Sequence, residues 1–266
     1  MAKFLRDEFI KNVTITEETL CLVNEFLSER EATINQELQR IQANQDERLV
    51  LTYIIRFDGR GYKLNDFDDV KKYYAQAKHV ERVIFILDSA VSERTARQYG
   101  THFELRLDNK EQNNTYIQVA SDDSDAVDTA FCGLKEIIGN CTNKNWIVRS
   151  TWSQLLVQIF GVVFGFVLSL IAALKISPHL GIENSFVITF IFAFLIFSNA
   201  WGFLNQQILR FLDYSFPNIS FSRKGKNVLH WLAQALVGGI VVALTLLIIS
   251  KAFEWVGEIL GAYISK

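Results

Sequence analysis

The sequence predicts an α+β domain followed by an all-α membrane domain of three transmembrane helices. Three apolar segments of about 20 residues each follow residue 150, and this is the length that a helix needs to cross a bilayer. Several short runs before residue 150 alternate apolar and polar residues with a period of two, which is typical of strands. Runs with helical spacing lie before and between those strands.

Charge divides the chain at the same place. Residues 1–150 carry 20 of the 27 Lys and Arg and 25 of the 29 Asp and Glu, a net charge of −5, whereas residues 151–266 have a net charge of +3. No basic run in the first part is longer than Lys71-Lys72. Nucleic acid is therefore not an expected partner, because phosphates are neutralised by clustered Lys and Arg.

The beginning of the chain and its cysteines indicate a reducing compartment. Met1–Val13 is charged and lacks the apolar core of a signal peptide. The cysteines are odd in number and lack metal-type spacing, which favours free thiols in the cytosol. They are Cys21, Cys132 and Cys141.

Residues 1–47 are predicted to form a separate, mainly helical segment. Met1–Val13 has loosely helical spacing and is expected to be a short helix or an ordered arm. Thr14 followed by Glu17 has capping-box spacing, so a long helix is expected from about Thr16 to Gln45. Polar residues interrupt its heptads, which favours packing against its own domain; self-association through this helix is the alternative.

Residues 48–150 are predicted to form the α+β domain. Leu49–Phe57 alternates toward one face, and Asp58-Gly59 offers a tight turn into a second strand. The complete pattern is ββαβββα, a mainly antiparallel sheet of about five strands with helices on one face, preceded by the long helix. The further strands are expected at Val80–Leu87, Thr101–Leu107 and Thr115–Val119, and the helices begin after the acid clusters near residues 66 and 122.

No catalytic motif is found in this domain, so the chain is not predicted to be an enzyme. His79 and His102 have no second His, Cys or acid at metal-ligand spacing, and no metal or cofactor is expected. A nucleophile elbow, a phosphate loop and a dinucleotide fingerprint are absent from the sequence. Five arginines form a weaker candidate site for a small anion or nucleotide, with a solvated charged surface as the alternative. They are Arg56, Arg60, Arg94, Arg97 and Arg106.

The spans are predicted at about residues 152–176, 186–205 and 228–250, followed by an interfacial tail. Each contains a long window without Asp, Glu, Lys or Arg, and one such residue at mid-membrane costs about 2.5 to 3.5 kcal/mol. Lys and Arg lie before the first span and after the second, whereas the turn Ser177–Asn184 between these spans has none. The positive-inside rule therefore predicts a multi-pass protein with a cytosolic front domain, in the inner membrane if it is bacterial.

Two stripes on the spans are predicted to be helix-packing or oligomer interfaces. Small residues let helix backbones approach each other, and amides form hydrogen bonds across such interfaces. Packing within one chain and oligomerisation both account for the stripes. Their members are Gln154, Gln158, Gly161 and Gly165 in the first span, and Ala235, Gly239 and Ala243 in the third.

The spans hold no ionisable residue at depth, which weighs against an ion-coupled transporter. The predicted function is a membrane protein whose cytosolic α+β domain senses a ligand or partner protein and whose oligomerising spans signal or perturb the membrane. The expected partners are membrane lipid, further copies of the chain and a cytosolic protein. In layout the chain resembles the small membrane-anchored effectors of bacterial antiviral defence, which pair a cytosolic sensing domain with two to four spans. A membrane-tethered adaptor that recruits a cytosolic enzyme or complex is the alternative.

Overall fold

The computed structural model describes residues 4–111, 114–143 and 145–222, which fall into two compact units. The α+β unit comprises the described residues up to Trp146 together with residues 217–222, and the helical hairpin unit comprises Ile147–Phe216. The helix after residue 16 belongs to the α+β unit. The predicted third span, the interfacial tail and the stripe of Ala235, Gly239 and Ala243 lie outside the described residues.

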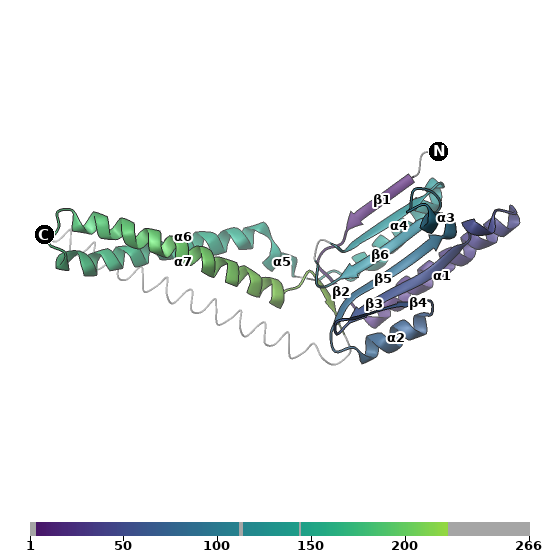
Figure 1. Ribbon diagram of the computed structural model, residues 1–266, viewed down its shortest axis with the longest axis horizontal. Helices are drawn as coiled ribbons and strands as arrows, with labels where there is room; N and C mark the ends of the chain where they lie inside the picture. Colours follow the sequence, from purple (N-terminus) through teal and green to yellow (C-terminus); the bar gives the residue numbers. More distant parts are fainter. Residues whose placement is uncertain (1–3, 112–113, 144, 223–266) are drawn as a thin grey trace. The chain divides into compact units, whose positions relative to one another are not determined.

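A six-stranded antiparallel sheet forms the centre of the α+β unit (Figure 1). From β3 to α4 the five predicted strands and two predicted helices follow in the expected order, but the short helix α3 (Ala90–Arg94) is added between β5 and β6, so the order is ββαβαββα and not ββαβββα. The strands lie in the order β1-β7-β6-β5-β3-β4. Their bounds are β1 Phe4–Phe9, β3 Leu49–Phe57, β4 Arg60–Leu64, β5 Val80–Ser89, β6 His102–Asp108 and β7 Tyr116–Ser121.

The sixth strand, β1, corrects the prediction of a helix or arm at the start of the chain. All six residues of β1 are exposed. Because the strand buries neither face, its sequence lacks the alternation of apolar and polar residues that predicts a strand. β1 pairs along its whole length with β7 at the sheet edge. Two ion pairs join β1 to the helix α4 (Ser124–Gly139): Arg6 with Asp128 at 2.7 Å, and Glu8 with Lys135 at 2.5 Å.

Three helices pack against one face of this sheet: α1 Glu17–Arg40, α2 Phe67–Gln76 and α4 Ser124–Gly139. The α1 N-cap is Thr16, whose side chain and that of Thr19 cap each other's backbone, so the predicted capping pair Thr14 and Glu17 is wrong. Leu20 and Leu27 of α1 are almost fully buried, and each such side chain stabilises the fold by about 1.5 to 3 kcal/mol.

A second, two-stranded sheet ties the chain beyond the hairpin back into the α+β unit. β2 (Val13–Ile15) pairs in parallel with β8 (Ile219–Phe221), and Ile219 is fully buried. Asn218 accepts a hydrogen bond of 2.7 Å from the Asn12 amide. The Tyr74 hydroxyl donates to the carbonyl oxygens of Ile15 and Ser222, at 3.3 and 3.1 Å. We refer to β2, β8 and these side-chain bonds as the clasp.

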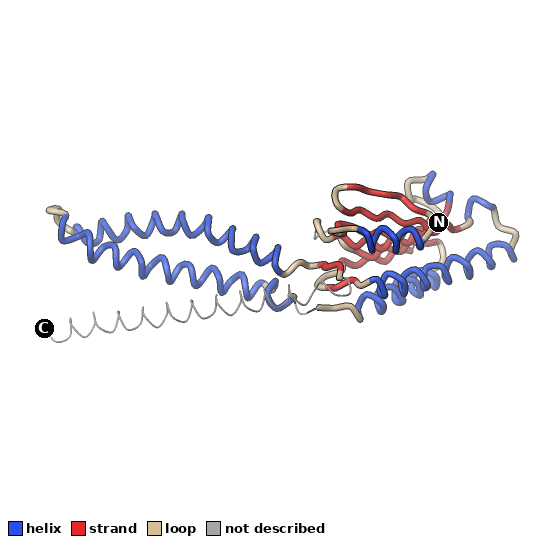
Figure 2. The backbone as a smooth tube through the Cα atoms, turned by 90° about the horizontal axis from the view of Figure 1, so that it is seen from below, coloured by secondary structure: helices blue, strands red, loops and turns tan. Residues whose placement is uncertain are grey.

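The helical hairpin unit consists of α6 (Thr151–Ile176) and α7 (Ser185–Ser215), joined by the short helix η3 (Ser177–His179) (Figure 2). Both are long and apolar enough to cross a membrane, by length and composition; only 17% of the most apolar window of α6 and 6% of that of α7 is buried. Two candidate spans are thus described where three were predicted. At its base, Arg149 donates to the Phe216 carbonyl oxygen and forms an ion pair of 3.1 Å with Asp213.

Candidate functional site

The face of the sheet opposite the helices carries a row of charged and polar residues, and we call it the open face. Side chains alternate across a strand, so burial of Phe103, Leu105 and Leu107 against the helices directs the residues between them to the other side. Pairing of β5, β6 and β7 brings these polar positions into register. They are Asp88, His102, Glu104, Arg106, Asp108 and Tyr116.

His102 lies between two carboxylates on this face. Its Nδ1 is 2.5 Å from Asp88 Oδ1, and its Nε2 is 3.4 Å from Glu104 Oε2. Burial alone would lower the pKa of His102, but hydrogen bonds to Asp88 and Glu104 outweigh it and raise that pKa. The arrangement therefore favours an imidazolium ion held by two acids.

Glu104 is the centre of this charge network. Its carboxylate accepts a hydrogen bond of 2.8 Å from the Tyr116 hydroxyl and forms an ion pair of 2.8 Å with Arg97. Burial would raise the pKa of Glu104, but the bonds from His102 and Tyr116 and the charge of Arg97 lower it to about 2. Across the described residues, no group of three or more His, Cys, Asp or Glu is placed to hold a metal ion.

The connection between β5 and β6 brings Arg97 over the open face through an unfavourable backbone. After the short helix α3 (Ala90–Arg94), Ala96 and Arg97 both have positive φ, 51° and 69°. For residues with a Cβ, this region costs about 1 to 2 kcal/mol each. Gly100 also has positive φ, and a Cβ there would lie 2.5 Å from Ser89 Oγ. Such strain is found preferentially at functional sites.

A groove of about 640 Å³ lies beside this connection on the open face. This volume is within the usual range for sites of small molecules. Val50, Thr52 and Ile86 contribute aliphatic surface from β3 and β5. Its charged lining residues are Arg48, Lys63, Arg97, Asp88 and Glu93.

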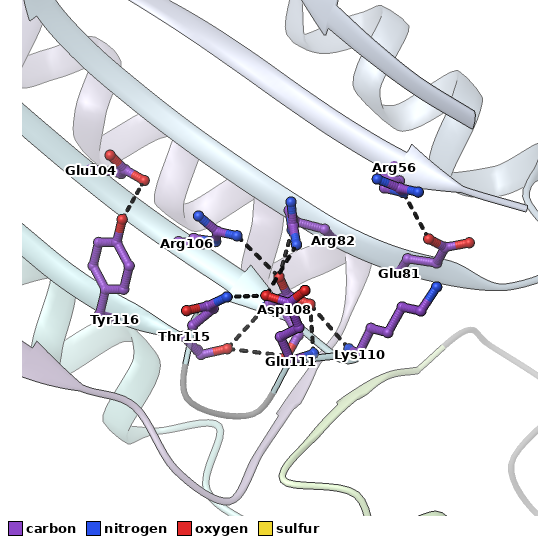
Figure 3. Close-up of polar contacts among 11 residues, drawn as sticks. Arg56, Glu81, Arg82, Glu104, Arg106, Asp108, Lys110, Glu111, Thr115 and Tyr116 are labelled. Carbon is purple, nitrogen blue, oxygen red and sulfur yellow. Dashed lines mark hydrogen bonds and ion pairs between the residues drawn. The ribbon is translucent and has the colours of Figure 1, made fainter. Parts of the chain in front are cut away.

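The far end of the open face holds a second polar cluster, shown in Figure 3. Asp108 is buried, and its carboxylate pairs with Arg82 at 2.5 Å and with Arg106 at 3.4 Å. Its other oxygen, Oδ1, accepts hydrogen bonds from the backbone amides of Lys110 and Glu111, each at 3.0 Å. The hollow beside this cluster is only about 100 Å³, and its lining holds three basic and three acidic residues. The amide bonds from Lys110 and Glu111 to Asp108 stabilise the turn after β6.

The five predicted arginines do not converge on one site. Arg97 lines the larger groove, and Arg56 lines the small hollow, where it pairs with Glu81 at 2.9 Å. Arg94 pairs with Asp46 on the surface, and Arg106 pairs with Asp108. Arg60 begins the edge strand β4 and lines neither hollow.

On the first predicted stripe, the structure separates glycines from glutamines. Gly161 and Gly165 are buried on α6 in line with Ser169 and Ala173, every fourth residue. Gln154 and Gln158 are exposed. The buried line faces α7, where Trp201 lies against Gly161 and Phe197 against Gly165.

Sequence reasoning missed Arg48 and Lys63 as groove residues, and it missed the acids around His102. Glu104 stands two residues after His102 in a predicted strand, and that spacing alone places both on one face. Asp88 depends on the register between β5 and β6, and Arg48 and Lys63 depend on how β3 and β4 meet the β5–β6 connection. None of these long-range relations leaves a local pattern.

No family model matches this chain, and comparisons with curated proteins and with solved structures find no similar protein. The molecule is therefore defined by its own architecture: an α+β unit with a strained, charged groove, interrupted by a hairpin of two candidate membrane spans.

Proposed function

We propose that this chain is an integral membrane protein whose α+β unit senses a ligand or partner and whose spans associate to signal or perturb the membrane. The observation that carries the membrane part is the exposure of large apolar side chains on α6 and α7. Exposed fractions reach 75% at Trp152, 67% at Phe192 and 64% at Phe203. A helix hydrophobic on all sides and not buried in protein requires lipid or another protein around it.

The clasp supports a hairpin that crosses the membrane twice. The chain leaves the α+β unit at Trp146 and rejoins it at Pro217, where β8 pairs with β2. Both ends of the hairpin therefore belong to one folded unit, and an even number of crossings is required between them. With the positive-inside rule, Arg149 and Arg210 near these ends favour the cytosol for that unit and the opposite side for Ser177–Asn184.

Insertion and orientation are tested together with two thiols. Cys132 is an exposed natural thiol on α4, and Gly181→Cys adds one in the turn between the helices, where a Cβ meets open space. In intact cells a membrane-impermeant maleimide is expected to label position 181 and to leave Cys132 unlabelled until the membrane is opened. Release of the protein by alkaline carbonate would contradict insertion, and the reverse labelling would contradict the orientation.

The layout, a sensing domain joined to a small number of spans, supports an effector of the kind found in bacterial antiviral defence. Such a protein must assemble several copies to perturb a membrane, because the two candidate spans that the structure describes enclose no path in one chain. The mass of the particle in detergent tests this: a monomer would contradict the effector proposal. The alternative is tested by replacing residues 147–216 with an unrelated transmembrane hairpin. If this variant restores the activity that a deletion strain has lost, the adaptor function is supported instead.

A further inference from the structure

We propose that the groove beside the β5–β6 connection binds a small organic anion, an apolar body carrying a phosphate or a carboxylate. This inference rests on the proposed sensing function of the α+β unit and adds the chemistry of what is sensed.

Two of the five charged lining residues are already paired. Asp88 lies 2.5 Å from His102, whose raised pKa favours a positive partner there, and Arg97 lies 2.8 Å from Glu104. These pairs form the rigid wall of the groove, since His102 and Glu104 are both nearly inaccessible to solvent.

The remaining charges favour an anion. Arg48 precedes β3 and Lys63 lies on β4; both are exposed, and neither forms an ion pair within the part of the chain that the structure describes. Glu93 is the one acid of the lining left to oppose them. The available charge is thus positive, and charge-assisted hydrogen bonds from Lys and Arg are the usual means of holding phosphate or carboxylate.

The neutral part of the groove favours an apolar body. Val50 is 54% exposed and lies on the part of β3 that precedes its pairing with β4. Thr52 follows it on the same face of β3, and Ile86 of β5 pairs with Thr52. Together they form a flat aliphatic surface beside the cations. An apolar surface with few convergent polar groups is the usual composition of a small-molecule site.

The test uses the full chain in lipid nanodiscs, with calorimetry corrected for empty discs. Phenyl phosphate and benzoate distinguish the two anionic groups, inorganic phosphate lacks the apolar body, and phenol lacks the charge. At least one of the first two is expected to bind about tenfold more tightly than inorganic phosphate and phenol. Binding that is equally strong for phenol or for inorganic phosphate would overturn the proposal.

Variants locate the binding. Arg48→Ala and Lys63→Ala are each expected to weaken it about tenfold, and Glu93→Gln to strengthen it several-fold by removing the opposing charge. Arg60→Ala is the matched control, because Arg60 lies on the same edge strand as Lys63 but outside the groove. These side chains are exposed, so the fold should be retained, and circular dichroism checks it. Equal effects of Lys63→Ala and Arg60→Ala would overturn the assignment.

The result is separable from the membrane proposal. A chain that resists carbonate but binds none of the probes contradicts the groove alone. A chain that binds the probes but is released by carbonate contradicts the membrane anchor alone.

Discussion

Trp201 of α7 lies against Gly161 of α6 so closely that a Cβ atom at position 161 would be 1.5 Å from the indole ring. At Gly165, one turn further along, an added Cβ would be 3.8 Å from Phe197 Cβ, an ordinary contact. The two glycines share a helix face but differ in the space beside them.

Substitution of Gly161 should therefore loosen the hairpin, whereas the same change at Gly165 should not. Gly161→Ala is expected to destabilise the α6–α7 packing by about 1 to 3 kcal/mol, the usual effect of overfilling a packed interface. Gly165→Ala, the matched control, gains helix propensity without a steric clash, so it should be neutral or stabilise the hairpin by up to about 1 kcal/mol. The thermal unfolding of the full chain in detergent measures both, and equal effects would contradict the packing described.

The clasp should depend on Ile219. Ile219→Ala is expected to cost about 2 to 4 kcal/mol of local stability, because this fully buried side chain leaves a cavity. Hydrogen exchange should report the loss at the Val13 and Ser222 amides, which bond to the carbonyl oxygens of Asn218 and Ile15. Ser220→Ala serves as the control, since it removes only a part-buried hydroxyl contact with Thr14. Unchanged protection in Ile219→Ala would contradict the strand pairing.

Some of these features could be predicted from the sequence and others could not. β3, β6 and β7 could be predicted because alternate apolar residues face the helices, which leaves a period of two. β4 has no buried residue, and the Asp58-Gly59 turn indicated it. β1 and β8 could not be predicted, since one is wholly exposed and the other is three residues long. The glycines of α6 were recognisable as small residues, but their separation from Gln154 and Gln158 depends on which face meets α7. The groove joins four segments, so its lining follows only from the assembled sheet.

The stability of the α+β unit should pass through a maximum with pH. The folded pKa of His102 is above its usual 6.5, so its contribution is complete below that pH and is lost as pH rises through the folded value. The folded pKa of Glu104 is about 2 and its usual value 4.5, so its contribution is complete above pH 4.5 and is lost as pH falls toward 2.

The urea midpoint of β6 amides, followed by NMR, should therefore be highest between about pH 4.5 and 6.5. His102→Gln should remove the decline on the alkaline side and weaken the acidic one, because the bond from His102 is the first of the causes that lower the pKa of Glu104. In the same spectra, the imidazole of His102 should remain protonated to a higher pH than that of a free histidine. Titration of His102 below its usual range would contradict the network.

The strained connection should tolerate glycine. Ala96→Gly is expected to be neutral or to stabilise the α+β unit by up to about 1 kcal/mol, because glycine adopts positive φ without steric cost. Ala126→Gly in α4 should instead cost about 1 kcal/mol, as glycine does within a helix. Urea unfolding of the two variants gives the comparison. A similar loss in both would show that Ala96 is not held in the left-handed region.

The clasp also determines when, during synthesis of the chain, the α+β unit can finish folding. Thr14 of β2 and Ser220 of β8 are 206 positions apart in the chain, and Tyr74 and Ser222 are 148 positions apart. The α+β unit cannot complete this sheet until the ribosome has made both apolar helices. Its final closure therefore comes only after the hairpin has been synthesised in full, and a chain truncated within the hairpin leaves β2 without its partner strand.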